Sequence, residues 1–290
     1  MKRLNIIGAG KLGQTLARLL QDNDQFVIGD IVNRSLSSAQ EAQAFIGGGR
    51  AIQTLDQTKA ADIWLIATAD KDIIDCASAL YQLPHFSGHE VVFHCSGSLG
   101  SQVLCEKNHT KHVASIHPIH SFSDPKKSID TFSGSHCAYE GNSLALTVLL
   151  PAFESIGAQL LAVDGDQKTT YHAASVMACN YLVALMDASL SCFELAGIPR
   201  EQAQQLLLPI THATLDNALK DSPVNALTGP IARGDLDTVR AQVAQLSPYP
   251  QLQGIYQQLG LQTLDLAVRQ GLQENHQQLA QLLHQKNKPV

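Results

Sequence analysis

The sequence predicts an α/β fold in which a doubly wound, mostly parallel sheet is followed by an all-α C-terminal region. Short apolar runs alternate with helical stretches through roughly the first half of the chain, which is the order of elements in a parallel sheet. Several of these runs, such as residues 63–67, are apolar at every position, as strands covered on both faces are. From Asp166 onward the pattern is helical throughout.

The expected elements follow one another regularly. Residues 4–7 form the first strand, and leucines recur at helical spacing from Leu12 to Leu20. Residues 26–32 form the second strand, and Ser35 begins a helix that ends at a run of glycines. We expect further strands at residues 51–52, 63–67, 91–94, 113–116, 137–140 and 159–163, and further helices at residues 70–82 and 143–156.

The change of pattern predicts two domains, with a boundary near Asp164 and Gly165. Residues 1–164 are expected to bind a dinucleotide, and residues 165–290 to form a helical domain for substrate binding and dimerisation. Breaks between helices are expected at residues 197–199, 222–223 and 247–250, where glycine, serine and proline cluster.

Composition excludes several classes of function. The 290 residues are 44% hydrophobic, so a sizeable core can form, and 20 basic against 26 acidic residues give a net charge of −6, which disfavours nucleic acid as a partner. The 6 cysteines are scattered and are expected to be reduced thiols. Glycines interrupt the apolar N-terminus, and no apolar run reaches about 18 residues, so we expect neither a signal peptide nor a membrane partner, and a cytoplasmic protein.

A glycine-rich segment joins the first expected strand to its helix. Gly8-Ala9-Gly10-Lys11-Leu12-Gly13 matches the pattern GxGxxG in its required context. The first glycine permits the tight turn, the second lets the backbone approach a pyrophosphate, and the third lets helix and strand pack closely. The segment predicts a dinucleotide at the helix N-terminus.

The end of the second strand decides between NAD and NADP. If the strand ends at Gly29, Asp30 is placed to bind a ribose diol, as in NAD sites. If apolar Ile31 and Val32 continue the strand, the position belongs to Asn33-Arg34-Ser35, whose guanidinium and hydroxyl suit a 2′-phosphate. We prefer the second interpretation, which predicts NADP; the alternative is that Arg34 is merely exposed and Ser35 an N-cap.

Later strand ends supply further candidate residues. Thr68 and Ala69 are expected to line the nicotinamide ribose, and Ser96 to bind the carboxamide or the substrate. His117 follows a strand and is a candidate proton donor, because an imidazole titrates near neutral pH; a structural histidine is the alternative. His117 and His120 lack a ligand cluster at zinc spacing, so no metal is expected.

The first helix after the boundary carries a polar stripe. Lys168, His172, Ser175 and Cys179 share one face of an otherwise apolar helix, which is costly unless the stripe faces a cleft or finds partners. His172 is the second candidate proton donor, and Asn180 a candidate for positioning substrate. Further on, the loop at residues 228–235 places Thr228 and Arg233 near a substrate carboxylate, or simply lets Asp235 cap the next helix.

Together these motifs resemble a known family. The glycine segment, Asn33-Arg34-Ser35, the His-Pro segment at 115–122, residues 171–180 and residues 228–235 resemble Rossmann-like proteins with a helical C-terminal domain of unassigned function. That family is similar to pyrroline-5-carboxylate reductases, ketopantoate reductases, deazaflavin-dependent NADP reductases and 3-hydroxyacid dehydrogenases. The resemblance implies a homodimer built through the C-terminal helices. In the 3-hydroxyacid dehydrogenases a catalytic lysine precedes an asparagine by four residues; here His172 stands four after Lys168, so the match is partial.

The leading hypothesis is an NADP-dependent oxidoreductase. It would transfer a hydride to or from a small C=O or C=N substrate bound between the two domains, with NADPH as cofactor and with His117, His172, Ser96 and Asn180 as catalytic candidates. The alternative is an NADP-binding sensor or scaffold protein without turnover, which would keep the glycine segment and Arg34 but need neither histidine.

Overall fold

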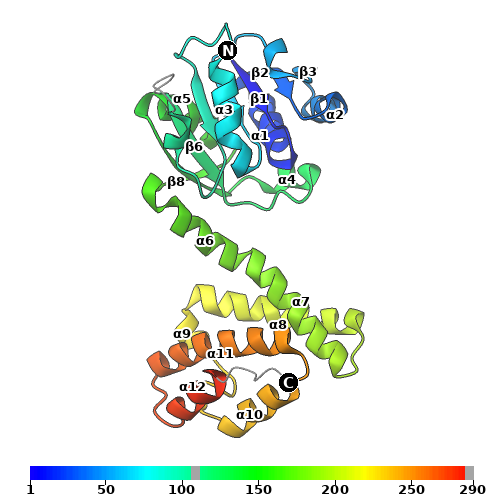
Figure 1. The fold of residues 1–290 in the computed structure, drawn as a ribbon, viewed down its shortest axis with the longest axis vertical. Helices are drawn as coiled ribbons and strands as arrows, with labels where there is room; N and C mark the ends of the chain where they lie inside the picture. Colours follow the sequence, from blue (N-terminus) through cyan, green and yellow to red (C-terminus); the bar gives the residue numbers. More distant parts are fainter. Residues whose placement is uncertain (106–111, 285–290) are drawn as a thin grey trace. The chain divides into compact units, whose positions relative to one another are not determined.

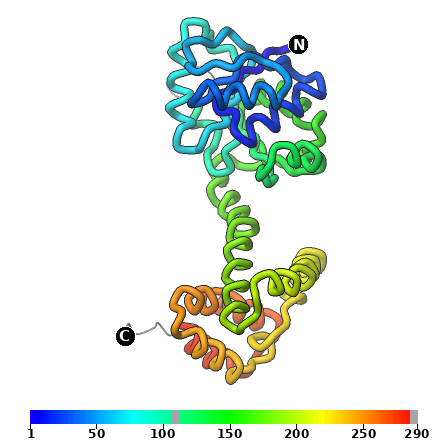
Figure 2. The backbone as a smooth tube through the Cα atoms, turned by 90° about the vertical axis from the view of Figure 1, so that its right-hand side faces the viewer, coloured from blue at the N-terminus to red at the C-terminus, as the bar shows by residue number. Residues whose placement is uncertain are grey.

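The computed structural model describes residues 1–105 and 112–284 and divides the chain into two compact units, Met1–Cys179 and Asn180–Val290 (Figure 1). The first unit is a twisted sheet enclosed by helices, and the second is helical in its described part (Figures 1 and 2). The expected fold class, a mostly parallel sheet followed by a helical region, is confirmed.

The sheet has eight strands in the order β3-β2-β1-β4-β5-β6-β7-β8 among the described residues. The first six strands are parallel to their neighbours, β7 is antiparallel to β6, and β8 is parallel to β7. The carboxyl ends of β1, β4, β5 and β6 therefore meet along one edge, which is where parallel sheets bind ligands. The strands are β1 (Lys2–Ile7), β2 (Phe26–Val32), β3 (Arg50–Ile52), β4 (Ile63–Ile66), β5 (Val91–His94), β6 (Val113–Pro118), β7 (His136–Gly141) and β8 (Gln159–Ala162).

Helices cover both faces of this sheet. Ile63 and Leu65 of β4 belong to one apolar core, with α1 (Lys11–Asp22), α2 (Leu36–Ile46) and α5 (Ser143–Ser155). Trp64 and Ile66, which point to the opposite face, belong to a second core with α3 (Ile73–Tyr81). This alternation explains why β4 is apolar at every position. A short helix that the sequence did not predict, α4 (Pro125–Thr131), begins at Pro125 and is capped by Asp124.

The second unit contains α7 (Asn180–Leu195), α8 (Arg200–Lys220), α9 (Pro223–Ala226), α10 (Leu236–Gln245), α11 (Pro250–Gln270) and α12 (His276–His284). The expected breaks between helices are confirmed. Its core consists of Ile231, Val239, Val243, Leu264, Ala267, Leu279 and Leu283. In the loop before α10, the Asp235 carboxylate accepts a hydrogen bond from the Thr238 backbone N–H (3.1 Å), so Asp235 is the helix cap.

Helix α6 (Lys168–Ala178) belongs to the first unit, although it lies beyond the boundary expected near Asp164 and Gly165. The expected boundary followed the change from strand to helix pattern. The compact unit extends one helix further because Lys168 is buried among residues of the sheet.

One helical stretch of the described residues, Gly165–Leu195, is long and apolar enough to cross a membrane by length and composition alone, and 6% of its most apolar window is buried. A single such stretch is weak evidence for a membrane span. Lys168 near its start is fully buried and bonded within the first unit. The absence of a membrane partner stays a prediction.

Candidate active site

The turn between β1 and α1 is held open by its glycines. Gly8 has φ +88°, and a Cβ there would lie 2.7 Å from the Thr68 side chain at the end of β4. A Cβ on Gly13 would lie 2.8 Å from the Gly8 carbonyl, so this glycine lets α1 pack against the turn. A Cβ on Gly10 would meet nothing within 4 Å. Gly10 therefore faces open space, as backbone that approaches a diphosphate must.

The side chain of Asn33 fixes this turn from the end of β2. Its Oδ1 accepts a hydrogen bond from the Ala9 backbone N–H at 2.6 Å. Lys11 and Leu12 follow in the first turn of α1, where Lys11 is exposed and Leu12 packs against the core. The glycine turn is thus preorganised by a neighbouring strand before any ligand arrives.

The strand β2 runs to Val32, which confirms the longer of the two extents considered for it. Asp30 is 1% exposed, and its carboxylate accepts from Arg50 Nε (2.7 Å) and from the Lys59 backbone N–H (2.6 Å). This carboxylate is therefore occupied inside the protein and does not stand at the strand end.

Among the residues after β2, one caps the next helix and others line a cavity. Ser35 caps α2, because its Oγ accepts from the Ser38 backbone N–H at 3.2 Å. Arg34 is exposed, and both Arg34 and Ser38 line the cavity beside the glycine turn. Ser38 thus reaches the cavity from a position that sequence reasoning missed; its place in the first turn after the cap was the available signal.

A cavity of about 930 Å³ lies over the glycine turn, which is within the ordinary size of a cofactor site. The Oγ1 atom of Thr68 is buried and, within the described part of the chain, has no hydrogen-bond partner. This unpaired atom and the open face of Gly10 both fit a dinucleotide. The cavity is lined by Ile7, Gly8, Ala9, Gly10, Lys11, Gln14, Val32, Asn33, Arg34, Ser38, Glu41, Ala42, Leu55, Ala67, Thr68, Ala69, Lys71, Asp72, Asp75, Cys76 and Ala79.

A second group of polar side chains lies at the ends of β4 and β5. The Ser96 hydroxyl donates to Asp70 Oδ2 (2.8 Å) and accepts from the backbone N–H groups of Leu99 (3.0 Å) and Ser98 (3.2 Å). Ser98 Oγ donates to the same carboxylate oxygen at 2.7 Å. The Ser96 hydroxyl therefore shapes this turn and ties it to Asp70, which follows Thr68 and Ala69 directly.

Lys168 joins α6 to the same edge of the sheet. Its ammonium is buried and donates to the Ser96 carbonyl (2.8 Å) and to Ser115 Oγ. Burial lowers the pKa of Lys168, and the carboxylates of Glu140 and Asp70 oppose that change. This buried charge holds the first turn of α6 against β5 and β6.

Anchoring α6 brings two of its aromatic residues to His117 at the end of β6. His117 Nδ1 and the Tyr171 hydroxyl share a hydrogen bond of 3.0 Å. The rings of His117 and His172 meet edge to face, with centroids 5.5 Å apart. Gly97 leaves room for both: a Cβ there would collide with His172 Nδ1 and lie 2.9 Å from His117 Nε2.

The imidazole of His117 is uncharged at neutral pH. Burial lowers its pKa to about 4, and the neighbouring His172 and Lys168 act in the same direction. His172 Nδ1 is buried and, among the residues described, has no hydrogen-bond partner. A neutral imidazole and an unpaired ring nitrogen thus lie side by side.

Two further histidines, His94 and His120, form hydrogen bonds with groups other than His117 and His172. His94 Nδ1 accepts from the Ser96 backbone N–H (3.1 Å), so its Nε2 donates to the Gly100 carbonyl (3.3 Å). Burial lowers the pKa of His94 to about 4. His120 instead contacts Ser135 Oγ at 3.0 Å, away from His117's partners.

The structure brings together three of the residues predicted for catalysis: Ser96, His117 and His172. Asn180 is the exposed first residue of the second unit, and its role stays a prediction. Sequence reasoning missed Tyr171 and Lys168 as site residues. For Lys168 the signal was the polar stripe of α6, where it precedes His172 by one helical turn; for Tyr171 it was the segment 171–180 in the family resemblance.

The described residues 1–105 and 112–284 contain no group of three or more His, Cys, Asp or Glu side chains that could hold a metal ion. The cysteines Cys76, Cys95, Cys105, Cys137, Cys179 and Cys192 are free thiols.

The strand order and the glycine turn define the first unit as a Rossmann-like, dinucleotide-binding type of domain. Residues 2–118 match the Rossmann-like domain family, and residues 135–263 match a domain of unknown function, DUF2520. The chain therefore combines a Rossmann-like domain with a region that matches this domain of unknown function. No curated protein matches it.

Solved structures with this fold include three that span most of the chain. Protein TM1727 from Thermotoga maritima is 25% identical, with TM-score 0.70, over 92% of this chain and 98% of that one. BF3122 from Bacteroides fragilis, described as a candidate NADP oxidoreductase, is 20% identical, with TM-score 0.77, over 91% and 98%. The 1-pyrroline-5-carboxylate reductase of Streptococcus pyogenes is 16% identical, with TM-score 0.62, over 93% and 99%.

Proposed function

We propose that this protein is an NADP-dependent oxidoreductase that transfers a hydride to or from the C=N or C=O carbon of a small substrate. One observation carries the proposal: the open glycine turn follows the carboxyl end of β1, and His117 lies at the carboxyl end of β6 in the same sheet, where it meets His172 of α6. The hydrogen bond between Ser96 and Asp70 joins the ends of β4 and β5, which lie between β1 and β6. The same fold in a candidate NADP oxidoreductase and in a pyrroline-5-carboxylate reductase supports it.

The residues of the cavity suit NADP in particular. The backbone of the turn at Gly10 would receive the diphosphate, and Arg34 with Ser38 would bind the 2′-phosphate. Asp30, the one acid considered for a ribose diol, is held by Arg50. Thr68 Oγ1 would gain a partner from the nicotinamide ribose. When bound, NADPH supplies the hydride.

His117 and Tyr171 would act on the substrate. If His117 Nδ1 donates to the Tyr171 hydroxyl, Nε2 carries the imidazole lone pair, beside Gly97 and His172. With a pKa of about 4, His117 orients a substrate as a neutral hydrogen-bond acceptor and does not repel a cation. This favours a protonated imine, whose reduction needs no further proton, over a carbonyl, whose alkoxide does. We assign Ser96 a positioning role, because its hydroxyl already donates to Asp70 and accepts from two backbone N–H groups.

A turnover assay tests the proposal. NADPH oxidation is followed against cyclic imines, 2-ketoacids and aldehydes, with the variants His117→Ala and, as the control, His120→Ala. We expect imines to be the best substrates and His117→Ala to lower kcat/KM by about 100-fold, because the substrate would lose the group that orients it for hydride transfer. Saturable NADPH binding without turnover of any of these substrates would instead support the sensor or scaffold protein.

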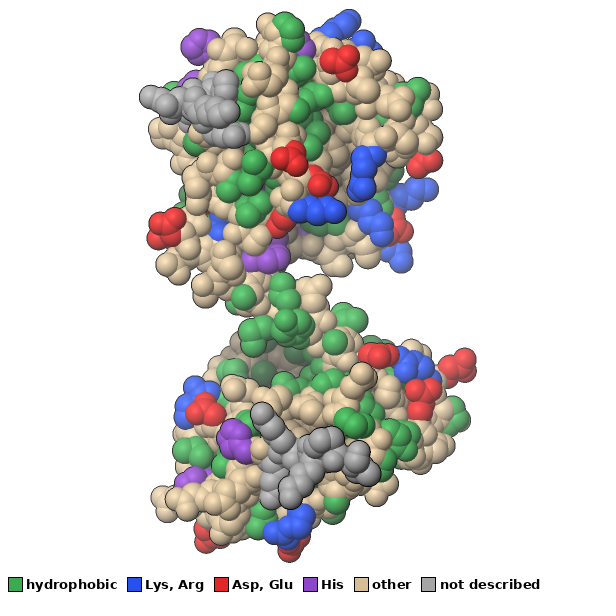
Figure 3. Space-filling view, viewed as in Figure 1, with side chains coloured by type: hydrophobic (Ala, Val, Ile, Leu, Met, Phe, Trp, Pro, Cys, Tyr) green, Lys and Arg blue, Asp and Glu red, His purple; other side chains and the backbone are tan. Residues whose placement is uncertain are grey.

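We also propose that the protein forms a homodimer through its C-terminal helices. The 21 residues of α8, all within the described chain, include a single buried one, Ala203, while Leu208 is 62% and Leu219 82% exposed. Figure 3 shows apolar side chains at the surface of this unit. Helices with this much exposed apolar surface are covered in the functional state, here by a second copy.

Light scattering coupled to size exclusion tests the dimer. Leu208→Glu should produce a monomer, whereas Gln205→Glu, an exposed polar position on the same helix, should remain dimeric. A wild-type monomer at micromolar concentration would reject this assembly. Recovery without detergent would agree with the expected cytoplasmic location, which stays a prediction.

A further inference from the structure

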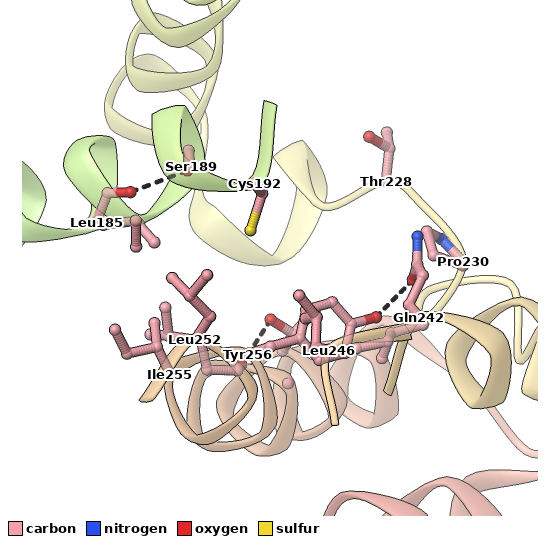
Figure 4. A pocket seen from close by; sticks show the side chains of 15 residues that line it. Leu185, Ser189, Cys192, Thr228, Pro230, Gln242, Leu246, Leu252, Ile255 and Tyr256 are labelled. Carbon is pink, nitrogen blue, oxygen red and sulfur yellow. Dashed lines mark hydrogen bonds between the residues drawn. The ribbon is translucent and has the colours of Figure 1, made fainter. Parts of the chain in front are cut away.

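The second unit contains an apolar pocket that the proposed reaction does not use. Its volume is about 350 Å³, and it lies between α7 on one side and α10 and α11 on the other, closed at one end by the segment at residues 228–231 (Figure 4). It is lined by Leu185, Ala188, Ser189, Cys192, Thr228, Pro230, Ile231, Gln242, Leu246, Leu252, Ile255, Tyr256, Leu259, Gly260 and Thr263. This size suits a small organic molecule.

The lining carries no charged side chain, and several of its hydroxyl protons are already used. Ser189 donates to the Leu185 carbonyl (2.9 Å) and Thr263 to the Leu259 carbonyl (2.8 Å), both within their own helices. Tyr256 donates to Oε1 of the exposed Gln242 at 2.5 Å, which uses the proton of the tyrosine hydroxyl. An ionic ligand would lose its hydration here without gaining a counter-charge.

We propose that this pocket binds a neutral, largely apolar molecule of about one to two rings in size, with any polar group placed at Gln242 and Tyr256. Ile255 and Leu259 are 39% and 43% exposed along its wall, and such a ligand would remove that surface from water. No residue of α8, whose exposed leucines are assigned to the contact with a second copy, lines the pocket.

Cys192 makes occupancy measurable. Its side chain is half-buried in the pocket wall, and Figure 4 shows its sulfur directed toward the residues of α11. Burial raises the pKa of this thiol, so it stays protonated at neutral pH and reacts slowly. A bound molecule would shield the sulfur from an alkylating reagent.

The test uses two probes that share their rings and differ in charge. Neutral N-phenyl-1-naphthylamine should bind the full-length protein saturably, and 8-anilinonaphthalene-1-sulfonate at least ~10-fold more weakly. Ala188→Phe, which fills the pocket, should weaken the neutral probe by at least ~10-fold, while Ala241→Phe, at an exposed position of α10 outside the pocket lining, should not. Gly10→Val, which removes the nucleotide site, should leave probe binding unchanged, so this test and that of the proposed reaction fail independently.

Alkylation provides a second readout. The neutral probe should slow the reaction of N-ethylmaleimide with Cys192 by at least ~5-fold, measured by peptide mass spectrometry, and leave exposed Cys179 unchanged. If Ala188→Phe does not fold, Thr263→Leu from the opposite wall replaces it. The proposal would be overturned by the absence of saturable binding, by equal affinity for both probes, or by a Cys192 that the probe does not protect. It would also be overturned if a folded variant lost both the dimer and probe binding, because a second copy would then cover the pocket.

Discussion

The two units of the molecule differ in how completely their own residues bury one another. In the first, α1 buries six of its 12 residues against the sheet, and every residue of β4 and β5 is buried. In the second, α8 buries one residue of 21, all of them described. The first unit thus buries much of its apolar surface within itself, whereas the second leaves apolar side chains of α8 exposed, the surface that we propose a second copy covers. In the first unit, where side chains are fully packed, candidate catalytic residues can be inferred directly from their contacts.

The largest expected effect tests whether α6 belongs to the first unit. Lys168→Ala removes a buried ammonium and leaves the Ser96 carbonyl and the Ser115 hydroxyl with only the long 3.4 Å hydrogen bond between them. We expect the free energy of unfolding to fall by about 3 kcal/mol in urea titrations. Lys220→Ala, which breaks an exposed pair with Asp216, should cost less than about 0.5 kcal/mol. An equal loss in the free energy of unfolding for the two variants would show that Lys168 does not anchor α6 to the sheet.

Acid should affect the first unit through its neutral buried histidines. Burial lowers the pKa of His94 to about 4, below the ordinary value near 6.5, so the unfolded chain binds the proton more tightly than the folded protein does. Stability is therefore full above about pH 6.5 and decreases as the pH falls to about 4, by about 3 kcal/mol for this group. His94→Gln should flatten that slope in urea unfolding at several pH values, and exposed His89→Gln should not. An unchanged slope in His94→Gln would mean that His94 is not neutral in the folded protein.

Two glycines of the same turn should separate ligand binding from folding. Gly10→Val should weaken NADPH binding by at least ~100-fold, about 2.7 kcal/mol, and leave the thermal midpoint unchanged, because a side chain there meets open space. Gly8→Val should lower the thermal midpoint, since it combines a positive φ with a collision at Thr68. Fluorescence titration measures the NADPH affinity of each variant, and thermal unfolding measures its midpoint. Tight NADPH binding by folded Gly10→Val would show that the diphosphate does not bind at this turn.

The smallest effect concerns the selectivity for the cofactor. Arg34→Ala should raise the Kd of NADPH by about 10-fold, or 1.4 kcal/mol, and that of NADH by less than about 2-fold. Arg240→Ala, an exposed arginine of the second unit, serves as the control. An equal loss for both cofactors would show that Arg34 does not touch a 2′-phosphate.

Sequence reasoning predicted the fold where local signals and burial agree. The strands from residue 4 to residue 94 lie where apolar runs are bounded by glycine or polar residues, and Ile31 with Val32 indicated that β2 runs past Asp30. The glycine segment was recognisable because its spacing and its position between strand and helix are both local.

The rest depended on contacts between distant segments. Nothing in the sequence around Lys168 shows that its charge is buried against Ser96, 72 residues away. Nor does the sequence show that Ser96 is bonded to Asp70, or that Tyr171 meets His117. Periodicity identifies which residues share a helix face, but not which strand ends that face covers.

The hydrogen bond from the Ala9 N–H to Asn33 constrains how this protein can be redesigned. An acid at the end of the second strand is the usual means of selecting a cofactor without a 2′-phosphate, yet here the residue at that position also holds the glycine turn that we propose binds the diphosphate. Asn33→Asp would keep an oxygen that accepts the hydrogen bond from Ala9 and would add a negative charge, whereas a larger residue would break this hydrogen bond. Engineering for NADH should therefore begin with Arg34 and Ser38, which contact the cavity without supporting the loop.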